Sequence, residues 1–278
     1  RSAARLTRAC STGLLTWWWR VEPSNERDWQ TDVSVLPYAT IDGDLVTVHN
    51  IRNFDYRSET DYTPQWESRT YDLDRLRSAD LVLSYWMGPH IAHTLVSFGF
   101  DGGERVVFSL EIRKERHESF SAIGGFFRQF EQILVAADER DIVRTRCNAR
   151  GEDVYLYRLQ MNQASARALF LEFLNAANEL RQKPRFYNTL TSNCTTIVFE
   201  LARVIAPALP MDYRLLLSGY FARYVYDMHG LTPGYRYDEL QALGHINERA
   251  LASDVSEDDF SMSIRQGVPG IPANEVNP

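Results

Sequence analysis

A cysteine at the start of an apolar helical segment is the feature of this sequence with the clearest chemical meaning. Cys194 follows Ser192-Asn193 and precedes Thr195-Thr196, and the apolar face of the segment begins only after it. A helix N-terminus carries unpaired N–H groups and partial positive charge, which stabilise a thiolate. The pattern therefore predicts a nucleophilic thiol. The alternative is a small apolar core residue, which is how most free cysteines behave.

A thiol nucleophile needs a base, and His93 is the best candidate for it. His93 lies inside a predicted strand, residues 91–100, between apolar neighbours. A histidine in the interior of a sheet needs a hydrogen-bonded role, either as this base or as a satisfied core residue. His90 stands at the edge of the same strand, and strand alternation points it and His93 to opposite faces. We therefore expect no metal site, and no cofactor is implied.

Glu111 is the candidate for the residue that orients this imidazole. The sequence Asp101-Gly102-Gly103-Glu104 predicts a hairpin between strands 91–100 and 105–112. Counting outward from its glycines puts His93 opposite Glu111, within one residue pair. A carboxylate there can hold the imidazole in the required tautomer. The alternative is an ordinary glutamate that faces solvent.

Further residues complete the predicted site. The backbone N–H of Cys194, with the Asn193 side chain, is expected to stabilise an oxyanion. Tyr187 and Ser109 are the other candidate substrate or oxyanion contacts. Polar residues that either support the site or form separate structural networks are His49, Asn50 and Arg113.

Composition limits the class of protein. The chain has 278 residues, 44% of them hydrophobic, which allows a sizeable core. Its net charge of −7 argues against a nucleic-acid partner, because phosphate binding needs a basic surface. The three cysteines lack metal-type spacing, and their odd number excludes a scaffold in which every cysteine is paired.

The order of elements predicts an α+β fold with an antiparallel sheet packed against helices. Strands are expected at 45–48, 81–86, 91–100, 105–112, 141–145 and 154–159, and helices within 119–134 and at 162–183, 194–205 and 213–229. Residues 1–20, which contain Trp17-Trp18-Trp19, are a candidate end of a membrane anchor; the alternatives are an amphipathic cap on the fold and the remnant of a signal peptide. We expect a linker at 21–40, the catalytic domain at 41–250, and a mobile C-terminal tail at 251–278.

Two resemblances bear on these residues. The string Tyr187-Asn188-Thr189-Leu190-Thr191-Ser192-Asn193-Cys194 resembles circularly permuted, NlpC-type papain-like enzymes, in which the histidine strand precedes the cysteine helix. Segments 48–57, 91–94, 108–114, 191–196 and 245–250 are similar to the Lnb N-terminal periplasmic domain family. That family takes its name from a bacterial lipoprotein N-acyltransferase. The resemblance implies a papain-like core and a Cys/His site that faces the periplasm next to the inner membrane.

The sequence thus leads to a periplasmic thiol acyltransferase or hydrolase, anchored to the inner membrane by its N-terminal segment. Its expected substrate is an acyl group of a phospholipid or lipoprotein at the membrane surface. One alternative is a cysteine peptidase or amidase acting on cell-wall peptide, and another is a non-catalytic periplasmic binding module. A lipid site predicts an apolar channel near Phe126, Phe127 and Phe130, whereas a peptide site predicts an open polar cleft.

Overall fold

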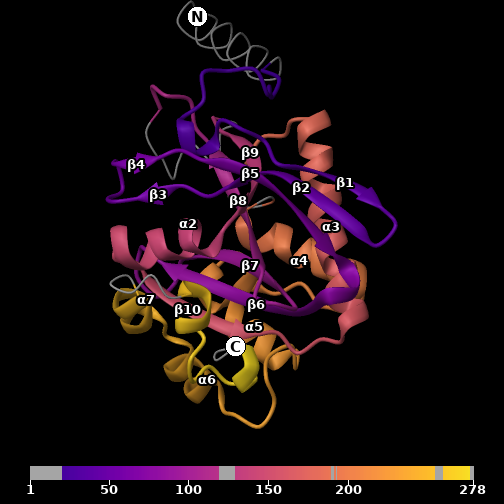
Figure 1. The fold of residues 1–278 in the computed structure, drawn as a ribbon, viewed down its shortest axis with the longest axis vertical. Coiled ribbons are helices and arrows are strands. Elements are labelled where there is room, and N and C mark those ends of the chain that lie inside the picture. The colour runs from indigo at the N-terminus through magenta and orange to yellow at the C-terminus, as the bar shows by residue number, and fades with distance from the viewer. Residues whose placement is uncertain (1–20, 119–128, 189–190, 192, 254–258, 276–278) are drawn as a thin grey trace, which may run out of the picture.

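A computed structural model describes residues 21–118, 129–188, 191, 193–253 and 259–275 (Figure 1). Among these residues, none of the helices combines the length and apolar character needed to cross a bilayer. The expected membrane anchor at 1–20 and the side chains of Phe126 and Phe127 lie outside the described residues.

The predicted α+β class is confirmed, with a mostly antiparallel sheet at its centre. The sheet has the order β1-β2-β9-β8-β7-β6-β10, and β5 pairs with β2 off this path. Only the single-residue contact between β2 and β9 is parallel among the described pairs. The strands are β1 Tyr38–Asp42, β2 Leu45–Arg52, β5 Trp66–Asp72, β6 Leu76–Tyr85, β7 Ala92–Phe100, β8 Arg105–Arg113, β9 Glu131–Ala137 and β10 Asp153–Arg158.

Helices cover both faces of this sheet. Those in the described residues are α2 Glu139–Arg144, α3 Gln163–Gln182, α4 Cys194–Ile205, α5 Phe221–Asp227, α6 Tyr237–Gly244, α7 Asn247–Ser253 and α8 Phe260–Ser263. Short elements are a hairpin of β3 Asp55–Tyr56 and β4 Tyr62–Thr63, a π-helical turn η4 Thr145–Ala149, and 3-10 turns η1 Thr31–Val33, η2 Leu73–Arg75, η5 Tyr213–Leu215, η6 Ser218–Tyr220 and η7 Ala273–Glu275.

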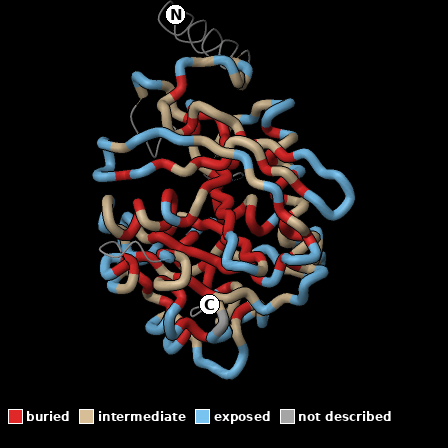
Figure 2. The backbone as a smooth tube through the Cα atoms, viewed as in Figure 1, coloured by how far each residue is buried: buried red, intermediate tan, exposed pale blue. Residues whose placement is uncertain are grey.

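The buried residues lie in the middle of the molecule (Figure 2) and form two hydrophobic clusters, one on each face of the sheet. Helices α3 and α4 pack on one face, where Phe98 and Phe108 of the sheet meet Phe170 and Phe173 of α3 with ring centroids 5.0–5.8 Å apart. Helices α2, α7 and α8 pack on the other face. The long apolar period of α3 made this helix predictable, and the structure confirms it within a residue of each end.

Three of the predicted elements are wrong in type or extent. Part of the expected helix at 119–134 is the start of strand β9, whose residues are buried on both faces. A strand buried on both faces reads as a continuous apolar run, which periodicity cannot distinguish from a buried helix. The expected strand at 141–145 is helix α2, which Asp138 caps. The expected helix at 213–229 breaks into η5, η6 and α5.

Residues 21–40 are part of the fold rather than the expected linker. Trp29 is buried, forms a β-bridge with Glu115, and stacks beneath the guanidinium of Arg113 at 4.3 Å. Strand β1 already begins at Tyr38. The segment lacks an apolar period because it docks through isolated side chains, and such docking leaves no local pattern.

The described part of the expected mobile tail is also packed. Phe260, Ile264 and Val268 are buried. Arg265 has no exposed side-chain surface and pairs with Asp80 at 2.8 Å and Glu139 at 2.5 Å. Burial alone would raise the pKa of Asp80, but neighbouring arginines hold it at about 2. The sequence of this segment is acidic and contains Gly and Pro, which suggested a solvated tail. Its partners lie more than a hundred residues away, so no local pattern showed that it packs.

We predict that Arg265→Met destabilises the protein by about 3–5 kcal/mol, because it leaves the buried carboxylate of Glu139 without its ion-pair partner and removes one of the arginines around Asp80. Arg116→Met is the matched control, since Arg116 forms a largely exposed ion pair with Asp28 and should cost less than about 1 kcal/mol. Urea unfolding measures both. Equal losses of unfolding free energy in the two variants would contradict a stabilising role for the buried ion pairs of Arg265.

Candidate active site

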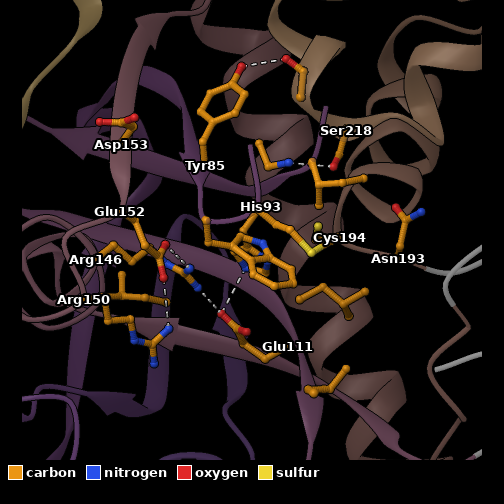
Figure 3. Close-up of a pocket in the computed structure, with 18 of the residues that line it drawn as sticks. Tyr85, His93, Glu111, Arg146, Arg150, Glu152, Asp153, Asn193, Cys194 and Ser218 are labelled. Atoms are coloured by element: carbon orange, nitrogen blue, oxygen red, sulfur yellow. Dashed lines mark hydrogen bonds and ion pairs between the residues drawn. The ribbon is translucent and has the colours of Figure 1, made fainter. Parts of the chain in front are cut away.

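The candidate site lies where strands β7 and β8 separate. Their ladder ends at the pair Leu95 and Ser109. Beyond that pair, β7 stays with β6 and β8 stays with β9. A cavity of about 1130 Å³ opens at this end of the sheet, and it is lined by His93 from β7, Glu111 from β8 and Cys194 from α4 (Figure 3).

Cys194 is the first residue of helix α4, as predicted. Asn193 is the N-cap: its side-chain oxygen accepts the N–H groups of Thr195 and Thr196, and the Thr196 hydroxyl accepts the Asn193 N–H. This reciprocal capping fixes the point at which the helix starts. The carboxamide oxygen of Asn193 is therefore committed to the helix. Its predicted part in an oxyanion site is left to the amide nitrogen, although the residue does line the cavity.

His93 is held by two residues of the neighbouring strand. Its Nε2 lies 3.0 Å from Oε1 of Glu111 and 2.6 Å from the Ser109 hydroxyl, which itself donates to Glu111 at 2.8 Å. Two residues beyond the last β7–β8 pair, the register places His93 opposite Glu111, which is the pairing that the hairpin count predicts. Ser109 lies with Glu111 on Nε2, so it supports the imidazole rather than an oxyanion. The other ring nitrogen, Nδ1, remains for the thiol.

The thiol and the imidazole change each other's proton affinity. Burial alone would raise the pKa of Cys194, but the charge of His93, a hydrogen bond to its ring and the Thr94 N–H lower it overall. Burial is the largest single effect on the pKa of His93 and lowers it, but the charges of Glu111 and Cys194 and the hydrogen bond to Cys194 together raise it to about 9. Figure 3 shows the sulfur beside the ring. Both changes favour a thiolate next to an imidazolium over the neutral pair.

Tyr187 reaches the site through backbone pairing to β9. The Gln132 N–H donates to the Arg185 carbonyl, and the Tyr187 N–H donates to the Phe130 carbonyl, both at 2.8 Å. The Cys194 backbone N–H donates to the Tyr187 hydroxyl. Burial, followed by the charges of Cys194 and Glu111, raises the pKa of this hydroxyl, so it stays a hydrogen-bond donor. The Tyr187 O–H and the Cys194 N–H thus meet beside the thiol.

Arg146, Glu152 and Ser84 join the site without having been predicted. Arg146 donates to Glu111 at 2.8 Å and to Glu152 at 3.1 Å, and the Ser84 hydroxyl donates to Glu152. Local sequence gives no sign of this: Arg146 is one of many arginines and is brought in by the π-helical turn η4. The register offers one signal, because Ser84 pairs directly with His93 across β6 and β7.

Three predicted supporting residues lie elsewhere. His49 stacks on the Tyr38 ring at 4.4 Å on β2. Asn50 has a positive φ of 61° at an irregularity of β2 and donates to a backbone carbonyl of the segment before β1. Arg113 anchors the segment that contains Trp29. None of the three lines the cavity, so their roles are structural.

The cavity wall is of mixed character. Charged residues line one part of it: Asp32, Arg52, Glu59, Lys114, Arg150 and Glu152. Aromatic and apolar residues line another: Tyr85, Trp86, Met87, Phe130, Tyr155, Leu216 and Tyr237. Figure 3 shows Tyr85 and Arg150 on opposite sides of His93. The described residues contain no group of His, Cys, Asp and Glu arranged to hold a metal ion.

We predict that Cys194 is alkylated by iodoacetamide far faster than Cys147 at pH 7. Cys147 is buried in the core, which raises the pKa of its thiol to about 12. The Cys194 rate should already be near its plateau below the free-thiol pKa of about 8.5. It should change again near pH 9, where His93 loses its proton. Peptide mapping by mass spectrometry assigns each adduct, and equal rates for both cysteines would contradict an activated thiol.

Residues 62–219 match the Lnb N-terminal periplasmic domain family, and this segment includes His93, Glu111, Arg146, Tyr187 and Cys194. No curated protein sequence and no solved structure gives a significant match to the chain. The matched segment covers more than half of the chain. The chain therefore belongs to the Lnb N-terminal periplasmic domain family, a family of the periplasm.

Proposed function

We propose that this protein is a thiol acyltransferase or hydrolase in which Cys194 is the nucleophile and His93 its general base and acid. One observation carries the proposal: a thiol with a lowered pKa at a helix N-terminus faces an imidazole that Glu111 fixes, and both open on a large cavity. The chain order, with the histidine strand before the cysteine helix, supports a circularly permuted papain-like arrangement.

In the first half-reaction the Cys194 thiolate attacks an acyl carbonyl carbon and forms a C–S bond. The carbonyl oxygen becomes an oxyanion, to which the Tyr187 O–H can donate; the Cys194 N–H, predicted as a direct donor, instead supports this hydroxyl by donating to its oxygen. When the tetrahedral intermediate collapses, the bond between carbon and the leaving group breaks. The His93 imidazolium protonates that leaving group, and Glu111 keeps the ring in position. An acyl-thioester on Cys194 remains.

In the second half-reaction an acceptor attacks the thioester. His93, now neutral, takes the proton of the acceptor, and the Cys194 thiolate leaves. An amine acceptor gives acyl transfer and water gives hydrolysis, with the same residues in the same roles.

The proposed substrate is an acyl ester of a phospholipid or lipoprotein. The apolar part of the cavity supports this, because Phe130, Met87 and Leu216 offer an acyl chain a wall next to the nucleophile. The exposure of this wall also supports a membrane surface as the place of action, with an N-terminal anchor in the inner membrane. Trp86, Met87 and Leu216 are 41%, 54% and 49% exposed at the mouth of the cavity, and tryptophan favours the membrane–water interface.

A second candidate function is a cysteine peptidase or amidase on cell-wall peptide. The charged part of the cavity, with Asp32, Arg52, Glu59, Arg150 and Glu152, is the observation that favours it. Such side chains can pair with the carboxylate and amine groups of a peptide. A non-catalytic binding module is the third reading, and an unreactive Cys194 would support it.

We predict that Cys194→Ala and His93→Ala each lower the rate of product formation by about 10³-fold or more, since neither residue of a nucleophile–base pair works alone. The assay supplies diacylphospholipid vesicles with an N-terminal lipopeptide and follows lysolipid, free fatty acid and N-acyl product by mass spectrometry. Cys147→Ala is the matched control and should retain activity. A parallel assay with cell-wall peptide separates the second candidate. Full activity in the Cys194→Ala variant would exclude the proposal.

We predict that the double variant Met87→Asp, Leu216→Asp lowers binding to phosphatidylcholine vesicles by about tenfold or more, because it puts charge where apolar side chains would enter the interface. Binding should change little between low and high salt, since the contact is apolar. Leu45→Asp is the control: Leu45 is 52% exposed at the start of β2, outside the cavity wall. Vesicle flotation measures both. An equal loss in the control would count against a specific membrane face.

A further inference from the structure

Arg146 is a buried charge beside the candidate site for which the mechanism above has no use. Its side chain is 6% exposed, and it donates to Glu111 through one terminal nitrogen and to Glu152 through the other. It therefore stands between two carboxylates, behind the residue that orients His93. An arginine held by two carboxylates on different elements is fixed in both position and direction.

Arg146 contacts His93 indirectly, through the carboxylate of Glu111. The same oxygen, Oε1, receives the Ser109 hydroxyl, the Arg146 guanidinium and His93 Nε2 at 2.8, 2.8 and 3.0 Å. Arg146 and the imidazole thus share one carboxylate oxygen. The positive charge of Arg146 offsets part of the negative charge of Glu111. Glu111 therefore stabilises the protonated form of His93 less than it would alone.

The network closes back on the strand that carries the histidine. Glu152 accepts the Ser84 hydroxyl as well as Arg146, and Ser84 is the β6 partner of His93 on β7. Arg146 is consequently anchored to both strands that flank His93: to β8 through Glu111 and to β6 through Ser84. This placement explains why the guanidinium cannot swing into the cavity or out to solvent.

We propose that Arg146 is a positioning residue, which presents the Glu111 carboxylate to His93 as one half of an ion pair instead of as a lone negative charge. A lone buried carboxylate would bind the imidazolium so strongly that the ring would be a poor acid toward a leaving group. An ion pair keeps the hydrogen bond that orients the ring but weakens the charge behind it. The pair acts as a neutral side-chain acceptor would.

The other charges around His93 fit this assignment. Glu111 comes from β8, Arg146 from η4 and Cys194 from α4; Glu111 and Cys194 raise the pKa of His93, whereas Arg146 lowers it. Arg146 is therefore the positively charged group of this set that opposes them. Only the kinetic consequence of this role rests on the proposed mechanism. The effect of Arg146 on the pKa of His93 exists whether or not the protein is an enzyme.

The test is a titration of His93 by NMR on ¹³C-histidine-labelled full-length protein, between pH 5 and 11, in the wild type and five variants. Arg146→Met should raise the pKa of His93, which corresponds to an acid dissociation constant about tenfold smaller. Arg146→Lys keeps the charge and should stay within about threefold of the wild type. Arg150→Met is the control: Arg150 also lines the cavity, but it lies 3.7 Å from Glu152 and does not contact Glu111. It should leave the titration unchanged.

The double variant, Glu111→Gln combined with Arg146→Met, keeps the test valid if Arg146→Met alone fails to fold. Glu111→Gln by itself should lower the pKa of His93 strongly, because the imidazolium loses its carboxylate partner and Arg146 keeps only Glu152 to offset its charge. Adding Arg146→Met should return the titration toward wild type. A double variant that titrates like Glu111→Gln alone would overturn the proposal, as would an Arg146→Met variant that folds and titrates like wild type.

A kinetic readout separates this role from the proposed function itself. With the lipid assay above, Arg146→Met should lower kcat by about tenfold at pH 7 with little change in KM. It should also move the alkaline limb of the pH–rate profile to higher pH. If wild-type protein has no activity on any substrate but the titrations behave as expected, the positioning role stands and the acyltransferase proposal fails. If activity is present but His93 titrates alike in all variants, the acyltransferase proposal stands and the positioning role of Arg146 fails.

Discussion

The separation of β7 from β8 beyond the Leu95–Ser109 pair is the constraint on which the candidate site depends. A continuous ladder would bring His93 and Glu111 together but would leave no opening for a substrate. Each strand is instead held by its outer neighbour, β6 or β9. Because those ladders continue, the two strands diverge without losing their positions. The helix that carries Cys194 then reaches the opening, and Tyr187 follows from backbone pairing to the start of β9.

Two clusters of buried charge in the described part of the chain have different consequences. The cluster of Asp80, Glu139 and Arg265 is closed off from solvent, and its ion pairs clamp the C-terminal segment to the sheet. The cluster of Glu111 and Arg146 is built from the same kinds of group but faces the cavity. An ion pair without an opening only holds elements together. Beside the His93 imidazole, the Glu111–Arg146 pair also affects the pKa of the ring.

The two buried cysteines of the described chain show how strongly surroundings decide reactivity. Cys147 lies in an apolar core on η4, and burial raises the pKa of its thiol to about 12. Cys194 is buried as well, but the charge of the His93 ring, a hydrogen bond to that ring and the Thr94 N–H outweigh the cost of burial. Burial alone therefore does not distinguish a structural thiol from a nucleophilic one. The sign of the nearest charge does.

The amino-acid sequence was enough to predict the α+β class, the hairpin of β7 and β8, the helix that begins at Cys194, and the pairing of His93 with Glu111. These follow from local patterns: apolar periods, a capped helix start, and a turn whose glycines set the register. The folded chain was needed to show that Arg146, Glu152 and Ser84 complete the site, that His49, Asn50 and Arg113 lie outside it, and that residues 21–40 and 259–275 are packed. Their partners lie far away in the chain, and an ion pair between distant segments leaves no periodic signal because its energy depends on where the fold places the charges.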